Sequence, residues 1–472
     1  MKTYLIQYNN ELLSYPRKIN QRGFTYEEAM LCVEKNNLQG YSLICIDDEI
    51  EKYHLIGNQD LKMFMDPEVY VYDTWRNAYI NNNINNLSLP LQVETNSEYV
   101  SKLAETYEEY LRQLRMPAFV YESGLVTEIE NTCQMIMRIL EQLIGGSVLE
   151  AEELLKKMIS NYIKDPFFVS QLDQSYSFRG IAPFVNLQRN RLSDVYKEMR
   201  EHDLTFYRVR KKNKGKKEDI SKLTHMVHLP YELRNKAGDM RFSRAGVPCL
   251  YLGTTTYVCS RECNWNREDE ELYVSAYVPN LAGKKLKILN LTISQALING
   301  IYNSLLDGGE EYKKTLQMSM LRIFPLVIAT SFSVREESRN IKYEYLISQA
   351  LMNVLTDMSI DGIAYLSMKG KNEFQYPQGV NLALTVTDIT ACRQYSQVCN
   401  MFKITEPIRF ENQTEDEALS YINAIYKERY ESGYENFMSQ INEGGKSIFY
   451  GNTSYGKFDN YLLSQQLMDF RV

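Results

Sequence analysis

One segment limits the possible folds of this chain more than any other, the stretch from Arg241 to Glu262 with the sequence RFSRAGVPCLYLGTTTYVCSRE. A Gly-Val-Pro corner at 246–248 leads into a short apolar run, 249–252, which is typical of a buried strand. Three threonines at 254–256 follow the run, and threonine is a favoured residue at the start of a helix. The segment therefore predicts a strand, a tight turn and a helix, with Glu262 about two turns into the helix.

Three kinds of functional group would be brought together by this arrangement. Arg241 comes from a loop, Tyr251 from the strand and Glu262 from the helix. A guanidinium can hold a phosphate, a tyrosine ring can stack on a planar ligand, and a carboxylate can stabilise a developing positive charge. The same residues also allow a plain alternative, in which Tyr251 belongs to the core and Arg241 and Glu262 form a surface ion pair.

Four blocks of the sequence, in this order, resemble the RES domain, a family named for its arginine, glutamate and serine. The first block is FYRVR at 206–210, which is similar to the family's first strand with its arginine, here Arg208. The second is the segment that contains Arg241, Tyr251 and Glu262, in which a phenylalanine stands where tryptophan is common. The third is IDGIAYLSM at 360–368, in which Ser367 matches the family's serine, and the fourth is NLAL at 381–384. The resemblance covers about residues 204 to 390.

This resemblance implies both a fold and an activity. The fold is α+β, an ADP-ribosyltransferase-like RES domain preceded by a mainly helical N-terminal region. Members of the family degrade NAD, often as toxins, so NAD is the expected substrate and a bacterial toxin or phage-defence effector the expected role. Glu262 would stabilise the ribose cation, Tyr251 would stack on nicotinamide, and Arg241 would bind the pyrophosphate. Ser367 would contact the ribose or orient the attacking water, and Arg208 would add a second phosphate contact.

The chemistry of NAD leaves several reactions open. Nicotinamide leaves as a neutral molecule, so the barrier lies in forming a ribose cation similar to that of the glycosidases. Water or phosphate can capture this cation, which makes the protein an NAD glycohydrolase or an NAD phosphorylase. ADP-ribosyl transfer to a protein or nucleic acid is a second class of function. An inactive RES-like interaction module, in which Ser367 is a plain strand-end hydroxyl, is a third.

The length of 472 residues predicts two or three domains. We expect a variable region of unknown role at 1–110, a helical hairpin and linker at 111–200, the RES domain at 201–400 and a helical, polar tail at 401–472. The hairpin is predicted from apolar residues at three- and four-residue spacing in 129–144 and again in 154–163. The run SYSFRGIAP at 175–183 is interpreted as a packed linker, with a pocket role for Arg179 as the alternative. The long segment 280–345, with helical patterns near 293–306 and 312–323, would form a lid or a partner surface.

Charge and composition argue against several other kinds of protein and of binding site. The net charge of −7 argues against a broad nucleic-acid surface, and the one basic run, 211–217, is expected to be a solvated loop. No run of about 18 apolar residues is present, so we expect no membrane span. The polar N-terminal sequence is unlike a signal peptide, so we expect a cytoplasmic protein. The eight cysteines lack the spacing of a metal site and are expected to be reduced; no metal is predicted.

An active NAD-degrading enzyme would harm its own cell, so restraint is expected. A separate antitoxin would supply it in a toxin–antitoxin pair, and self-inhibition by the N-terminal region is the alternative. We also expect a homo-oligomer.

Overall fold

The structure, a computed structural model, describes the following residues: 3–8, 11–13, 26–35, 42–47, 52–56, 84, 87–115, 124–179, 204–217, 219–300, 309–334, 339, 341–369, 379–410, 440–443, 446–450 and 453–470. Residues 411–439 of the predicted helical, polar tail lie outside the described residues. The chain divides into two compact units. The first comprises Met1–Leu87, Glu108–Thr127 and Gln295–Gly300, and the second comprises Ser88–Tyr107, Glu128–Ser294 and Ile301–Val472.

The first unit contains a small antiparallel sheet with strand order β2-β1-β3-β4. Its strands are β1 (Thr3–Tyr8), β2 (Glu11–Leu13), β3 (Ser42–Asp47) and β4 (Lys52–Ile56). Helix α1 (Tyr26–Lys35) packs on β1, where the rings of Tyr4 and Tyr26 lie 5.4 Å apart. The N-terminal region predicted to be mainly helical therefore also contains a sheet, and helices make up most of its described residues from 96 to 179. Short strands that pair across tens of residues leave a weaker sequence pattern than a long amphipathic helix does.

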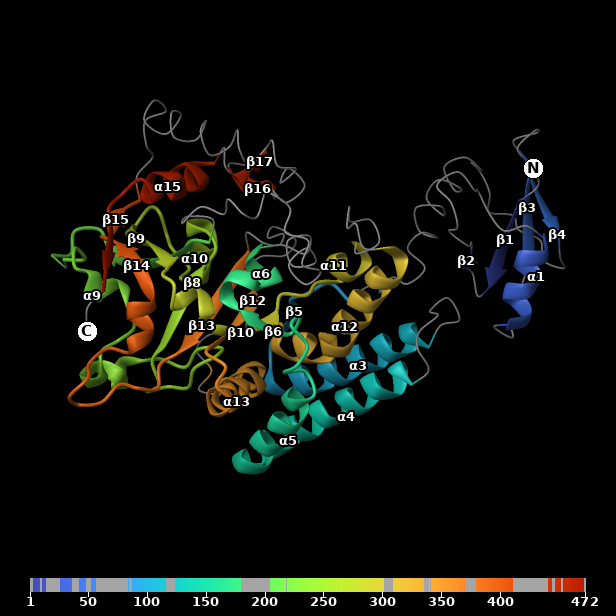
Figure 1. Ribbon diagram of the computed structural model, residues 1–472, viewed down its shortest axis with the longest axis horizontal. Coiled ribbons are helices and arrows are strands. Elements are labelled where there is room, and N and C mark those ends of the chain that lie inside the picture. Colours follow the sequence, from blue (N-terminus) through green and yellow to red (C-terminus); the bar gives the residue numbers. More distant parts are fainter. Residues whose placement is uncertain are drawn as a thin grey trace. The chain divides into compact units, whose positions relative to one another are not determined.

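A mixed sheet forms the centre of the second unit, in the order β18-β14-β9-β7-β8-β13-β12-β10-β6, with β15 beside β9 (Figure 1). Among these described strands, only the neighbours β10 and β12 run parallel to each other. The combination of helices with a largely antiparallel sheet agrees with the predicted α+β class. Four strands of this sheet, β6, β14, β15 and β18, lie outside the range 201–400 expected for the domain. The strands are β6 (Val169–Gln171), β7 (Phe206–Asn213), β8 (Cys249–Gly253), β9 (Glu270–Pro279), β10 (Lys287–Leu291), β12 (Gly362–Leu366), β13 (Val380–Thr385), β14 (Phe402–Thr405), β15 (Ile408–Arg409) and β18 (Leu467–Asp469).

The two faces of this sheet pack against different cores. Leu250, Leu252 and Leu382 point to one face and pack with Phe206 in a large apolar cluster. Tyr207, the next residue of β7, points to the other face, where helices α10 (Thr256–Glu262) and α15 (Ser454–Leu463) cover it. Neighbouring residues of a strand alternate between faces, so this division decides which side chains can meet.

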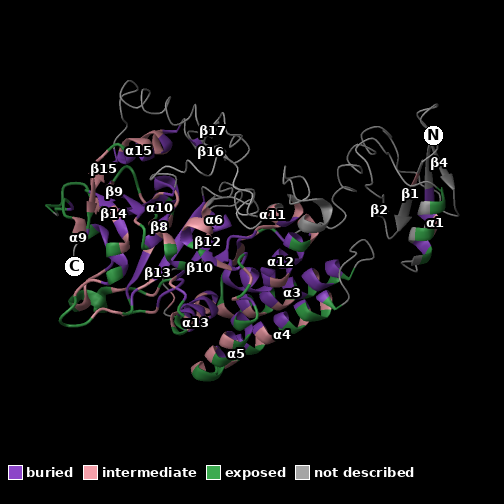
Figure 2. Ribbon diagram, viewed as in Figure 1, coloured by how far each residue is buried: buried purple, intermediate pink, exposed green. Residues whose placement is uncertain are grey.

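Long helices pack in the second unit beside the sheet, and Figure 2 shows exposed residues along α4 and α5, whereas α12 is mostly buried. They confirm the predicted helical hairpin and the helical pattern at 312–323, and α5 lies beside α13 (Figure 1). The unit boundary crosses the first two of them. The helices are α3 (Asn96–Leu114), α4 (Leu125–Ile144), α5 (Val148–Ser160), α12 (Gly309–Thr330) and α13 (Tyr343–Asp357).

The shorter elements complete the described chain. A parallel pair joins β5 to β11, and β16 and β17 form an antiparallel hairpin. These elements are β5 (Leu91–Val93), α6 (Tyr176–Arg179), α9 (Leu223–Met226), α11 (Gln295–Gly300), β11 (Phe332–Val334), β16 (Gln440–Glu443) and β17 (Lys446–Phe449).

The run SYSF at 175–178 is anchored by a buried polar network. The hydroxyls of Ser175 and Ser177 donate to Asn290 Oδ1 at 2.5 and 2.9 Å. Asn290 Nδ2 donates in turn to Ser170 Oγ at 3.0 Å, and Asn290, Ser175 and Ser177 are fully buried. A paired network in a dry interior fixes one arrangement, which agrees with the predicted packed linker. A pocket role for Arg179 stays a prediction, and 180–183 lie outside the described residues.

Gly362 belongs to the strand, although the sequence Asp-Gly favours a turn. It opens β12 and pairs with Leu384 on β13, and a Cβ at this position would lie 2.4 Å from the main-chain oxygen of Ala383. Gly362→Ala would therefore push the two strands apart, and we expect it to lower the free energy of unfolding by about 1–3 kcal/mol. Urea unfolding measures the loss. Gly238→Ala is the matched control, because a Cβ at Gly238 has no atom within 4 Å; equal midpoints for the two variants would contradict the prediction.

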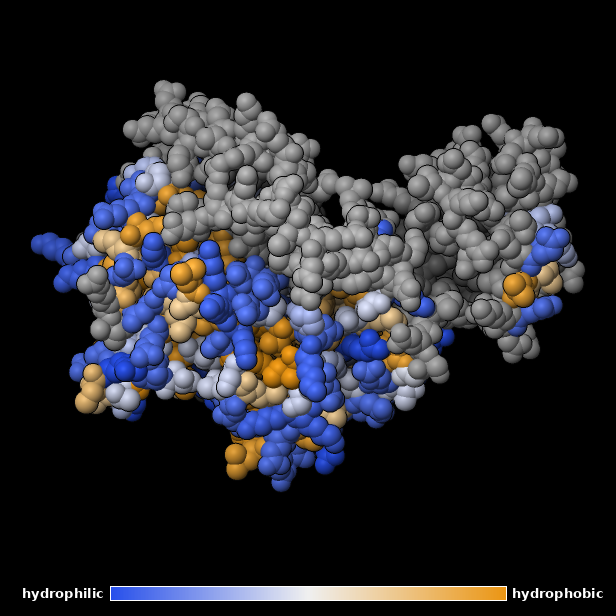
Figure 3. All heavy atoms as spheres, in the orientation of Figure 1, coloured by the Kyte–Doolittle hydropathy of each residue, from blue (hydrophilic) through white to orange (hydrophobic). Residues whose placement is uncertain are grey.

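Two of the five lysines in the basic run at 211–217 pair with acidic residues of β9, and the loop prediction is wrong for 211–213, which belong to β7. Lys211 pairs with Glu270 and Lys212 with Glu271, each at 3.0 Å. On the face of the molecule drawn in Figure 3, hydrophilic residues cover much of the coloured surface, with apolar patches between them. No helix within the described parts of the chain has the length and apolar character to cross a membrane.

Candidate functional site

Glu262 is positioned by a short helix that packs tightly on the sheet. The side chain of Thr255 caps α10 by accepting a hydrogen bond from Val258 N at 3.1 Å, which confirms the predicted threonine cap. Gly253 ends β8 just before this cap. A Cβ there would lie 2.6 Å from side-chain atoms of both Val258 and Cys259, so glycine lets the helix approach the strand. Glu262 is the last residue of α10.

The carboxylate of Glu262 is held by two side chains on one of its oxygens. Ser367 Oγ donates to Glu262 Oε1 at 2.7 Å, and Asn381 Nδ2 donates to the same oxygen at 2.7 Å. Ser367 and Asn381 are buried, whereas Glu262 is partly exposed. Within the described residues, Oε2 of Glu262 receives no hydrogen bond. The carboxylate is thus oriented through one oxygen, and its second oxygen is left for another partner.

Sheet register explains why Ser367 and Asn381 meet. Asn381 on β13 pairs with Gly253 on one side and with Tyr365 on the other. Ser367 follows the end of β12, as predicted, and its main-chain N–H donates to Gly379 O at 2.9 Å. The site therefore combines β8, β13 and β12. Asn381 was recognised only as the start of a strand block, because a lone asparagine in a strand carries no signal of a role.

Arg241 is buried and is held by main-chain carbonyls. Nη1 donates to Thr330 O at 2.9 Å and Nη2 to Phe332 O at 2.5 Å, and the guanidinium lies 5.0 Å from the ring centre of Tyr345. These partners come from the long segment between Glu262 and Ser367, so that segment builds the surroundings of Arg241. The alternative of a surface ion pair is wrong for Arg241, because its side chain is only 9% exposed.

Tyr251 ties the turn that carries Arg241 to the sheet. Its phenolic oxygen accepts from Phe242 N at 3.2 Å and forms a hydrogen bond with Ser243 Oγ at 3.1 Å. Burial raises the pKa of Tyr251 well above its ordinary value, so the hydroxyl is protonated at neutral pH. The residue as a whole is partly exposed, in contrast to Leu250 and Leu252 on the opposite face.

Tyr365 links the two charged residues of the site. Its side chain shares a face with Asn381, and its ring lies 4.6 Å from that of Phe242. Burial and then the Glu262 carboxylate raise the pKa of Tyr365 far above its ordinary value, while Arg241 opposes them. The charges of Arg241 and Glu262 therefore act in opposite directions on the pKa of this hydroxyl. Tyr365 is a further residue that the sequence did not single out.

Arg208 lies on the opposite face of the sheet. Tyr207 pairs with Gly253, in the same row as Asn381, so Arg208 projects to the other side. Its Nη1 donates to Tyr251 O at 2.6 Å and its Nη2 to Val227 O at 3.3 Å. The predicted phosphate contact does not fit beside Glu262, because the register of β7 sends the side chain away, and Arg208 is left out of the proposed site.

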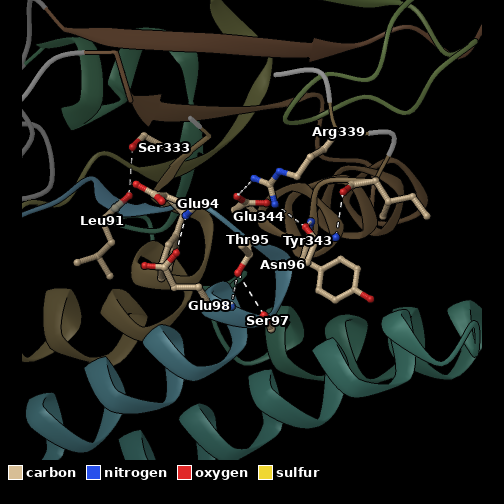
Figure 4. A network of polar contacts seen from close by, with 12 residues as sticks. Leu91, Glu94, Thr95, Asn96, Ser97, Glu98, Ser333, Arg339, Tyr343 and Glu344 are labelled. Atoms are coloured by element: carbon tan, nitrogen blue, oxygen red, sulfur yellow. Dashed lines mark hydrogen bonds and ion pairs between the residues drawn. The ribbon is translucent and has the colours of Figure 1, made fainter. Parts of the chain in front are cut away.

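A polar network fixes the start of α13 at Tyr343 and Glu344 (Figure 4). Asn96, the first residue of α3, accepts from Arg339 Nη1 at 2.6 Å on its Oδ1. Arg339 Nη2 donates to Glu344 Oε1, also at 2.6 Å, and Glu344 is fully buried. Because Glu344 immediately precedes Tyr345, this ion pair holds the start of α13, from which Tyr345 reaches Arg241.

The start of α3 is itself capped in the same view (Figure 4). Glu98 N donates to Thr95 Oγ1 at 3.1 Å, and Glu94 N donates to Glu98 Oε2 at 2.6 Å. This arrangement resembles a capping box, in which a threonine and a glutamate satisfy the free N–H groups of the first turn.

Among the described residues, no group of three His, Cys, Asp or Glu side chains is placed to hold a metal ion.

Comparison with known proteins gives one informative similarity. No protein-family model and no solved structure matches the chain. The chain is 23% identical over 357 residues to a protein of Bacillus subtilis (strain 168) described as "Putative toxin YopC". The aligned region covers 73% of this chain and 74% of that relative, so the similarity extends well beyond the four RES-like blocks.

Proposed function

We propose that this protein cleaves the nicotinamide–ribose bond of NAD. One observation carries the proposal: Glu262 Oε1 is fixed by Ser367 and Asn381 at 2.7 Å each, while Oε2 remains available. Cleavage of this bond needs an oriented negative charge beside the ribose, because positive charge develops there. The resemblance of residues 204–390 to the RES domain supports the same reaction.

The reaction proceeds in two steps. The bond between the ribose carbon and the pyridinium nitrogen breaks, and its electron pair neutralises the nitrogen as nicotinamide leaves. The Glu262 carboxylate stabilises the ribose cation through Oε2. Water then adds to the carbon and loses a proton, giving ADP-ribose, whereas addition of phosphate instead would give its phosphorylated form.

Arg241 and Tyr251 complete the proposed site. A guanidinium has five N–H donors, so Arg241 retains donors for the NAD pyrophosphate beyond the two that bind Thr330 and Phe332. Tyr251 is partly exposed as a residue and would stack its ring on nicotinamide, with its hydroxyl fixed by Phe242 and Ser243.

A toxin role follows as part of the proposal. The relative of Bacillus subtilis is described as "Putative toxin YopC", and loss of NAD would stop the growth of a cell. Restraint of such an activity would come from the N-terminal region or from a separate antitoxin.

Incubation of the purified full-length chain with NAD tests the proposal, with products separated by chromatography. We expect nicotinamide and ADP-ribose in equal amounts, or phosphorylated ADP-ribose in phosphate buffer. Transfer of radiolabel from NAD to a protein or nucleic acid would show that the reaction is ADP-ribosyl transfer and not hydrolysis. Intact NAD, together with no heat of binding in calorimetry, would overturn the proposal.

A further inference from the structure

Asp459 lies beneath the helix that carries Glu262. It belongs to α15, is 4% exposed, and accepts a hydrogen bond from Thr256 N, 3.3 Å from Oδ1 and 3.2 Å from Oδ2. The hydroxyl of Tyr450 donates to Oδ2 at 2.5 Å. Thr256 is the first residue of α10 and Glu262 the last, and Figure 1 shows α15 beside α10. Asp459 therefore holds the start of the helix that presents Glu262 at its end.

The surroundings of Asp459 offer no neutralising cation. The facing titratable groups are Tyr450, Cys259 of α10 and Tyr207 of β7, whose hydroxyl donates to the main-chain oxygen of Asp459 at 3.4 Å. Burial raises the pKa of Tyr450 and of Cys259 well above their ordinary values, so both are neutral near pH 7. No Lys, Arg or His in the described chain forms an ion pair with Asp459. Burial accordingly raises the pKa of the Asp459 carboxyl to about 7.

The charged form of this carboxyl holds α10 more firmly than the neutral form. As a carboxylate it accepts from Thr256 N–H and Tyr450 O–H together and faces the positive end of the helix. A protonated carboxyl must donate its own hydrogen, which competes with one of these two bonds. The start of α10 is then less tightly fixed, and Glu262 moves with it.

We propose that Asp459 is a positioning residue for Glu262, whose ionised carboxylate locks α10 in place and whose protonation loosens it. Any effect on catalysis rests on the proposed NAD cleavage, whereas the movement of α10 does not. The C-terminal segment outside the RES-like blocks thereby becomes part of the working site.

Ionisation of Asp459 lowers the free energy of unfolding, because the cost of burying its charge exceeds the gain from its stronger hydrogen bonds. Its folded-state pKa lies above its ordinary value, so folded Asp459 stays protonated at pH values where the unfolded chain has already ionised. The stability contribution is lost as the pH rises from about 4 to about 7. Asp459→Asn should therefore leave the melting temperature at pH 8 unchanged or raise it, although it removes a hydrogen-bonded side chain.

Fluorescence of Trp265 tests the movement without any enzyme assay. Trp265 N donates to Ser260 O at 3.0 Å at the end of α10, and Trp75→Phe removes the other tryptophan of the chain. We expect a transition near pH 7 that disappears in Asp459→Asn. In Tyr450→Phe its midpoint should shift to higher pH, because the Tyr450 hydrogen bond lowers the pKa of Asp459. The same transition in Asp459→Asn would overturn the proposal.

Kinetics at pH 8 test the consequence for catalysis. Asp459→Asn should lower kcat about 10- to 100-fold with little change in KM, because a displaced catalytic group costs rate rather than binding. A purely structural residue would instead lower the melting temperature and spare the kcat of the folded enzyme, and that result would overturn the proposal. If the unaltered protein does not consume NAD, the proposed function fails, and the fluorescence titration still decides the role of Asp459.

Discussion

Glu262→Gln is expected to lower the kcat for NAD cleavage by about 10²–10³-fold. Glutamine keeps the size of the side chain and an oxygen that can accept from Ser367 and Asn381, but it removes the negative charge. Since the charge stabilises only the ribose cation, KM should change little. Steady-state release of nicotinamide measures the effect, and an unchanged melting temperature would show that the fold is intact.

Smaller decreases in kcat are expected when either of the two residues that orient Glu262 is replaced by alanine. Ser367→Ala and Asn381→Ala each retain the carboxylate and remove one hydrogen bond to Oε1, and we expect a decrease in kcat of about tenfold for each. Full activity in Glu262→Gln, or larger losses in the two alanine variants than in Glu262→Gln, would contradict the assigned roles.

The largest loss of stability is expected from Glu344→Ala. Its carboxylate is fully buried and pairs at 2.6 Å with Arg339, whose side chain is 13% exposed. Removing one partner leaves the guanidinium buried without a counter-charge, so the free energy of unfolding should fall by about 3–5 kcal/mol. Urea unfolding followed by circular dichroism measures the loss, because the start of α13, which carries Tyr345, is held less firmly in the variant.

The double variant Arg339→Met/Glu344→Leu distinguishes the effect of leaving one buried charge unpaired from the effect of changed packing. Both charges are removed and the apolar volume is kept, so most of the lost stability should return. Equal destabilisation of the single and double variants would show that packing at these positions, rather than the unpaired charge, accounts for the effect.

Local features of the site were predictable from the sequence because their signals are local. The apolar run that contains Tyr251 specifies a strand, and the threonines after it specify a helix start, so β8 and α10 follow from neighbouring residues alone. Ser367 at the end of a strand follows in the same way from the apolar run before it.

Contacts that depend on register were not predictable in this way. Asn381 reaches Glu262 only because β13 lies between β8 and β12, and the two residues are 119 positions apart. The face of the sheet on which Arg208 lies is decided by the pairing of Tyr207 with Gly253, which no spacing within FYRVR reveals. The same holds for Asp459, whose partner on α10 is 203 positions away.

The strands at the two ends of the large sheet limit how the protein can be shortened. β6 covers the free side of β10, and β18 covers that of β14, through main-chain pairing at Lys287–Leu289 and at Lys403–Thr405. A fragment cut at 201–400 would lose β6, β14, β15 and β18, and would expose unpaired N–H and C=O groups of β10 and β9 along the sheet. Open strand edges of this kind pair with other chains. The smallest fragment that keeps these edges closed extends from before residue 169 to beyond residue 469, and a shorter one invites self-association.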